Sequence, residues 1–135
     1  MIAPDPQNPL TGPFWRAANN DSLVMCWCNS CDHAVWFPKE DCPDCGETTG
    51  WRQLSGRARL LSWTVVQGPI NPSFKTPYIP ALVVPEEAPG SRLVTQLVDI
   101  GETELMCDMP LQVCFRELET LEGLRYRAPL FRSRR

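Results

Sequence analysis

Short apolar segments alternate with turn-forming residues along this chain. Residues 22–27 and 34–38 each contain a run of β-branched and aromatic side chains, and Pro38 ends the second run, which predicts two paired strands. Longer runs follow between stretches rich in proline, glycine and acidic residues. They predict strands at 57–67, 78–84, 92–98, 112–118 and 124–128. Residues 51–56 read as a connector, and residues 105–109 as a connection with at most one helical turn.

The run at 57–67 changes its apolar side part-way along. Ala58 and Leu60 alternate with Arg57 and Arg59, so the first part of the run has its apolar residues on one side. Leu61 and Trp63 place apolar residues on the other side further along. A strand that switches its buried face is expected where a sheet coils into a barrel, often with a bulge. Five strands with a proline-rich loop at 68–77 indicate a mainly β fold, an OB-type Greek-key barrel. An SH3-like barrel or a sandwich fits the same periodicity.

The N-terminal region is predicted to be an extended arm followed by a short helix. Residues 1–10 contain three prolines, and Pro13 is tolerated in the first turn of a helix over 12–19. Phe14 and Trp15 are adjacent, so they cannot both face one core. We expect one to pack on the following module and the other to be partly exposed. Alternatively, the pair is an aromatic anchor for a partner protein.

Four cysteines form two Cys-x-x-Cys pairs separated by ten residues: Cys28, Cys31, Cys42 and Cys45. Two such turns facing each other place four thiolates in a tetrahedron, which suits a structural Zn²⁺ with no open coordination position. We therefore predict that these four residues are zinc ligands in a zinc ribbon. Two disulfides or a redox pair are the alternatives.

Neighbouring residues are interpreted as supporting this ribbon. Cys26 lies two positions before the first pair and is predicted to be a small buried apolar residue. His33 breaks the ligand spacing, so it is predicted to face solvent or to flank the metal. Gly46 can adopt the left-handed backbone that a cysteine turn needs, and Asp32 is a tolerated choice in the other turn.

Composition narrows the class of protein further. The 135 residues carry a formal net charge of −3, which disfavours a general nucleic-acid binder. The N-terminus lacks a signal-peptide pattern, the cysteine count is odd, and no apolar run reaches bilayer length, so we expect a cytoplasmic protein with no membrane contact. The predicted modules are an arm and helix (1–20), a zinc ribbon (21–52), the barrel (53–128) and a basic tail (129–135).

The sequence predicts no enzyme acting on its own. It has one histidine and no glycine-rich phosphate loop. Cys107 and Cys114 lack a histidine partner in the barrel and are predicted to be core or shielded thiols. The acidic pairs at 86–87 and 102–104 are interpreted as a solvated rim. A four-cysteine zinc provides no activated water.

Several motifs occur in the order found in a known family. They are Phe14-Trp15, Cys28-x-x-Cys31, Cys42-Pro43-x-Cys45-Gly46, Leu54-Ser55-Gly56-Arg57-Ala58, Ser62-Trp63-Thr64-Val65-Val66 and Pro77-Tyr78-Ile79-Pro80-Ala81-Leu82-Val83. In this order the chain resembles the DUF35 family over about residues 12–128: a rubredoxin-like zinc ribbon followed by an acyl-CoA-associated OB domain. It departs from the family at Asp32, where glycine is usual, and at 107–111, where Ile-Gly-Met is usual.

This resemblance implies a non-catalytic accessory subunit in a hetero-oligomer. Similar proteins are partners of thiolases, of lipid-transfer-protein-like aldolases, or of hydratases that shorten steroid side chains as CoA thioesters. The resemblance therefore implies docking on a thiolase-fold enzyme, a structural zinc, and help in forming or stabilising that enzyme's acyl-CoA site. A stand-alone acyl-CoA binding protein is one alternative.

The C-terminal region is the one basic feature of the sequence. Arg125, Arg127 and Arg132 are candidates to hold the CoA phosphates, because arginine binds phosphate with two parallel hydrogen bonds. Alternatively, these residues contact an acidic partner or form a solubilising, partly disordered tail. Since ribbons and OB barrels also occur in RNA and single-strand binders, a nucleic-acid-binding protein is a further alternative, disfavoured by the negative charge and scattered aromatic residues.

Overall fold

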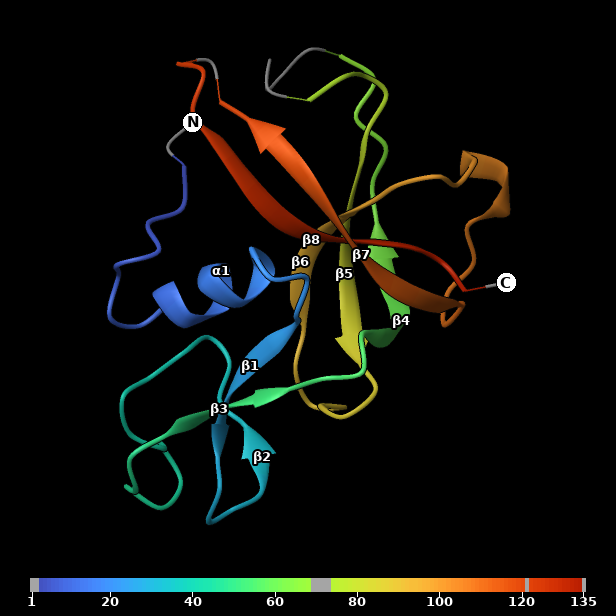
Figure 1. The fold of residues 1–135 in the computed structure, drawn as a ribbon. Helices are drawn as coiled ribbons and strands as arrows, with labels where there is room; N and C mark the ends of the chain where they lie inside the picture. The colour runs from blue at the N-terminus through green and yellow to red at the C-terminus, as the bar shows by residue number, and fades with distance from the viewer. Residues whose placement is uncertain (1–2, 69–73, 121, 135) are drawn as a thin grey trace.

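A computed structural model describes residues 3–68, 74–120 and 122–134. Its elements are α1 (Gly12–Ala18), β1 (Val24–Cys28), β2 (His33–Ala34), β3 (Gly50–Gln53), β4 (Arg57–Trp63), β5 (Ile79–Pro85), β6 (Leu93–Leu97), the 3₁₀ turn η1 (Glu102–Glu104), β7 (Pro110–Glu119) and β8 (Arg125–Ser133). The helix is followed by a three-stranded ribbon sheet and then by a closed five-stranded barrel (Figure 1). The predicted mainly β class with an N-terminal helix is confirmed. Part of the predicted loop at 68–77, residues 69–73, lies outside the described residues.

The ribbon sheet has the strand order β2-β1-β3. The prediction that residues 51–56 form only a connector was wrong, because Trp51 and Arg52 pair with Cys26 and Met25 on β1. No alternation marks β3 in the sequence, and its strand conformation comes from pairing with a distant segment. The return strand is shorter than predicted and overlaps the range 34–38 only at Ala34.

The barrel has the strand order β4-β5-β6-β8-β7, closed by the antiparallel pairing of β4 with β7. The register between β4 and β5 shifts between Leu60 and Ser62, which is the bulge predicted from the change of apolar side. Strand β4 ends at Trp63 rather than at residue 67, although Val66 forms an isolated bridge with Tyr78. The helical turn expected within 105–109 lies earlier, at η1.

The last strand is longer than the sequence indicated. Strand β8 continues to Ser133 and pairs with β7 from Arg125 to Ser133. Residues 129–133 therefore belong to the barrel, and the prediction of a basic tail beginning at residue 129 was wrong for them. Pro129 lies within this strand, because proline is tolerated where its nitrogen faces a strand edge without a partner.

One apolar core connects the ribbon with the barrel. Ribbon residues Leu23, Met25 and Trp27 belong to the same buried cluster as the barrel core around Phe131. Helix α1 contacts both β1 and β8, as Figure 1 shows. The two modules therefore form one packed unit.

Polar contacts fix the junction between the modules. The backbone N–H of Ser55 donates to Glu87 Oε2 at 2.6 Å. Gly56 has φ +86°, and its carbonyl accepts a hydrogen bond from the Val113 N–H at 2.8 Å. Glu87 is thus half-buried and holds the chain as it enters β4, so the interpretation of residue 87 as part of a solvated rim was wrong.

Candidate functional site: a metal centre and an apolar pocket

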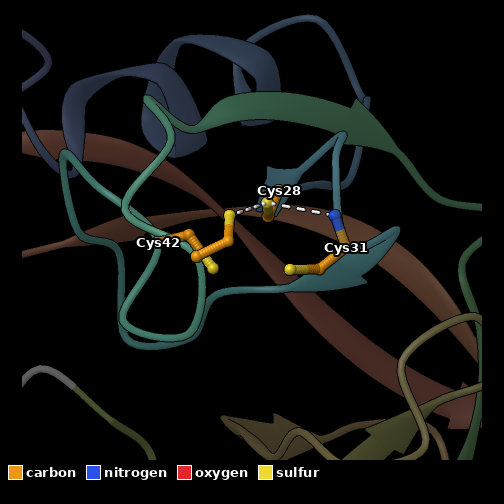
Figure 2. A group of neighbouring side chains, drawn as sticks. Cys28, Cys31 and Cys42 are labelled. Atoms are coloured by element: carbon orange, nitrogen blue, oxygen red, sulfur yellow. Dashed lines mark hydrogen bonds between the residues drawn. The ribbon is translucent and has the colours of Figure 1, made fainter.

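The structure brings the four cysteines of the two pairs together. Their sulfur atoms all lie within 4.8 Å of one another, and Cys28 Sγ and Cys45 Sγ are 3.5 Å apart. A tetrahedral zinc with Zn–S bonds of about 2.3 Å requires sulfur separations of about 3.8 Å. Figure 2 shows Cys28, Cys31 and Cys42 gathered around one point between the two turns. The four residues fit Zn²⁺ in number, chemistry and spacing.

Backbone N–H groups support the sulfur ligands. The Cys31 N–H donates to Cys28 Sγ at 3.3 Å, and the Asp44 N–H donates to Cys42 Sγ at 3.4 Å. The hydrogen bond from Cys31 lowers the pKa of the Cys28 thiol to about 7. Hydrogen bonding to Cys45 raises the pKa of the Cys31 thiol to about 12. A cation that binds all four sulfurs therefore displaces protons, so metal affinity increases with pH.

The residues around the cysteines occupy supporting positions. Cys26 is 1 % exposed, as predicted, and its sulfur lies 3.5 Å from the Lys39 carbonyl oxygen. The side chain of His33 bonds Asp44 Oδ2 at 2.9 Å, which joins the two cysteine turns beside the metal position. Asp32 has φ +56° and Gly46 has φ +80°, so both turns use the left-handed backbone that was predicted.

The three arginine candidates do not converge on one point. Arg125 pairs with Glu117 at 3.3 Å, and Arg127 pairs with Asp21 at 2.5 Å. Arg132 lies on the opposite face of β8 from these two, because side chains alternate along a strand, and it lines a polar cavity with Gln112. Arg127 thus ties the segment after α1 to the barrel.

The remaining candidates are dispersed. Cys107 is exposed, so the prediction of a core or shielded thiol was wrong for it, whereas Cys114 is half-buried. Burial raises the pKa of the Cys114 thiol. Glu86 is exposed and pairs with Arg57 at 3.0 Å. None of these described groups forms a nucleophile and base pair.

Sequence reasoning missed an apolar pocket between the modules. Its volume is about 550 Å³, and its lining comes from α1, the ribbon and barrel strands β5 to β8. None of the described lining residues carries a formal charge. The adjacent aromatic pairs 14–15 and 36–37 were the available signal, but only the fold shows that they face the same space.

A chain of aromatic rings connects the three modules along this pocket. The ring centroids of Phe37 and Trp36 are 5.7 Å apart, and those of Trp36 and Phe14 are 5.4 Å apart. Phe14 contacts Trp15 at 5.1 Å, and Trp15 contacts Tyr126 on β8 at 6.0 Å. Burial raises the pKa of the Tyr126 phenol, so it stays uncharged at neutral pH. Phe14 thus packs on the ribbon while Trp15 packs on the barrel.

The pocket opens where the barrel ladder stops between β6 and β8. Only Leu97 and Phe131 form a residue pair between these described strands. The next rung would need an N–H at Pro129, which proline lacks. Instead, the Thr95 hydroxyl donates to the Pro129 carbonyl at 3.0 Å. The two strands therefore diverge beyond this point and leave space between them.

Among the described residues, no helix has the length and apolar character needed to cross a bilayer.

Comparisons with known proteins agree with this architecture. A family model described as the rubredoxin-like zinc ribbon domain of ChsH2 matches residues 15–49, and one described as the C-terminal OB-fold domain of ChsH2 matches residues 51–116. The chain aligns over 93 % of its length with 95 % of a chain in the solved structure "Ltp2-ChsH2(DUF35) aldolase", with a TM-score of 0.82 and 30 % identity.

Two curated relatives differ in length. The chain is 32 % identical over 121 residues to a probable enoyl-CoA hydratase alpha subunit of Thermomonospora curvata, and this match covers 87 % of the chain and 37 % of the relative. It is 30 % identical over 101 residues to a DUF35 domain-containing scaffold protein of Methanocaldococcus jannaschii, covering 72 % of the chain and 70 % of the relative. The chain therefore spans little more than a third of the first relative.

The fold and the cysteine cluster define a zinc ribbon joined to an OB barrel. The chain belongs to the DUF35 family, as its sequence motifs predicted.

Proposed function

We propose that this chain is a non-catalytic accessory subunit that docks on a thiolase-fold enzyme, an aldolase or a thiolase, and helps form its acyl-CoA site. The observation that carries the proposal is the match over nearly the whole chain to the DUF35 chain of an aldolase assembly. The proposal includes a role in steroid side-chain degradation, because the family resemblance implies partners that shorten steroid side chains as CoA thioesters. Paired cysteines suited to zinc support a reducing compartment such as the cytoplasm.

The exposed rim of the pocket supports docking. Val94 and Phe37 are 81 % and 63 % exposed, and they are the two most exposed large apolar side chains among the described residues. Both line the apolar pocket. Exposed apolar side chains around a concavity are typical of a surface that a partner covers.

The chemistry of the sites supports a non-catalytic role. Four cysteine ligands complete the coordination of a zinc, so such a centre stabilises the ribbon without activating water. The described lining of the pocket has no positive charge to neutralise phosphates, which supports a protein or acyl partner over nucleic acid.

Co-expression with a thiolase-fold aldolase or thiolase from the same genome, followed by size-exclusion chromatography and activity measurement, tests the proposal. We expect one peak containing both proteins and higher enzyme activity in the complex. Phe37→Ser should weaken the complex by about tenfold or more, as expected for an aromatic anchor. Met106→Ser is the matched control, because Met106 is 57 % exposed and lies outside the pocket. Two separate peaks with unchanged enzyme activity would refute the proposal.

A further inference from the structure

The apolar pocket has the dimensions and chemistry of a small-molecule site. Its volume of about 550 Å³ lies within the range of ligand pockets, and it occurs where three modules meet. Val94 and Phe37 form the exposed rim of this pocket, and the less exposed lining residues enclose the space behind them. A protein surface can cover the rim, but a compact ligand fits the space behind it.

The lining determines which part of a thioester can enter. With no formal charge in the described lining, the pocket cannot compensate the CoA phosphates. Trp15, Trp36 and Tyr126 supply flat apolar walls, which favour contact with a rigid ring. The occupant that fits is therefore the uncharged, ring-bearing end of an acyl group.

One wall of the pocket depends on the metal centre. Trp36 and Phe37 lie between Cys31 and Cys42, in the segment that follows the short strand β2. The Val35 N–H donates to the Cys26 carbonyl on β1 at 2.8 Å, but Trp36 and Phe37 are in no described strand ladder. The second cysteine turn, joined to the first by zinc, would therefore fix the far end of this segment. Trp36 then contacts Phe14, through which the ring chain continues to β8.

We infer that this pocket binds the uncharged, ring-bearing acyl end of a CoA thioester, and that zinc in the ribbon holds the wall formed by Trp36 and Phe37. The inference rests on the proposed function for the source of the thioester. It assigns the acyl end to this chain and leaves the CoA phosphates to the partner enzyme. Zinc binding and ligand binding are then linked, so each increases the affinity for the other.

The ligand is tested with the full chain alone, loaded with zinc. N-phenyl-1-naphthylamine, an uncharged ring compound, should bind at one saturable site and gain fluorescence. Phenylacetyl-CoA should displace it, and coenzyme A without an acyl group should not. Equal displacement by both compounds, or no saturable binding of the probe, would overturn the inference.

Two variants on one hairpin locate the site. Leu118 lines the pocket, whereas Leu124 is 56 % exposed outside it. Leu118→Glu places a charge in the lining and should weaken probe binding by about tenfold or more, whereas Leu124→Glu should leave it unchanged. Circular dichroism checks that both variants are folded. Equal probe affinity in the two folded variants would refute the assignment to this pocket.

The proposed linkage between zinc binding and probe binding is measured separately. Removal of zinc by a chelator should weaken probe binding by about fivefold or more, and saturating probe should slow zinc release to the chelator. Equal probe affinity with and without zinc would refute the metal-held wall. The probe assay contains no enzyme partner, so it is independent of the docking experiment. If the chain docks on the enzyme but does not bind the probe, this inference alone is refuted. If the chain binds the probe but does not dock, the proposed function alone is refuted.

Discussion

Replacement of Gly56 by alanine should destabilise the protein through two separate effects. Gly56 has φ +86°, in the left-handed region that costs a residue with a Cβ about 1–2 kcal/mol. A Cβ at this position would lie 2.3 Å from Val113 Cγ1 and 2.8 Å from Gln112 Nε2. Relief of such overpacking costs about 1–3 kcal/mol.

The two costs add to about 2–5 kcal/mol, a large share of the about 5–15 kcal/mol that stabilises a typical domain. The Val113 contact cannot relax easily, because the Val113 N–H donates to the Gly56 carbonyl at 2.8 Å. A shift of β7 away from the new methyl group would break this hydrogen bond. Both effects therefore act on the junction between the ribbon and the barrel.

Urea unfolding of the zinc-loaded protein at constant m-value measures the effect, with two glycines as controls. Gly123 has φ +83° and only an ordinary contact at 3.8 Å, so Gly123→Ala should cost only the backbone strain of about 1–2 kcal/mol. Gly90 has neither feature, so Gly90→Ala should change stability by no more than about 0.5 kcal/mol. Each alanine also lowers the entropy of the unfolded chain by a similar amount, which cancels in the comparison. A loss at Gly56 no larger than that at Gly123 would refute the reasoning.

Three further predictions concern the metal, an ion pair and the thiols. Cys42→Ser removes one of four sulfur ligands, so zinc content after gel filtration should fall and the ribbon should lose its fold; full zinc retention would contradict the assignment. The guanidinium of Arg127 lowers the pKa of Asp21, so this ion pair stabilises the fold above the ordinary pKa of about 3.9 and is lost as the pH falls through the lower folded value. The stability difference between wild type and Asp21→Asn should thus be present at neutral pH and should disappear once acid has protonated Asp21 in the folded protein. A difference in urea midpoint that stays constant from neutral pH into acid would speak against it. In the zinc-loaded protein, Ellman's reagent should react rapidly with exposed Cys107 and not with buried Cys26, and Cys107→Ser should remove the fast phase; a fast phase that survives would show that another thiol is accessible.

Local spacing was enough to predict the cluster of four cysteines and the barrel strands. The spacing within each Cys-x-x-Cys turn places its two sulfur atoms near each other. Only the approach of one turn to the other could not be read from the spacing, and the structure brings all four sulfurs within 4.8 Å of one another. The change of apolar side after Leu60 predicted the bulge in β4, because the alternation of apolar and polar residues shows which side of a strand is buried.

Strand pairing decided what local pattern could not. Strand β3 has no alternation and exists through its pairing with β1. The strand predicted at 124–128 continues through Pro129 to Ser133 as β8, because the proline nitrogen faces the open seam beside β6. Glu87 appeared to be one more surface acid, and only the fold places it against the Ser55 N–H.

The sequence by itself therefore determined a four-cysteine ribbon, a five-stranded barrel and the family to which they belong. Tertiary structure decided that Phe14, Trp15, Trp36 and Phe37 line one uncharged pocket, and that Arg125 and Arg127 are engaged in ion pairs. The physical reason is distance along the chain. Ligand spacing and strand alternation are properties of neighbouring residues, whereas a pocket between three modules forms only when segments far apart in sequence pack together.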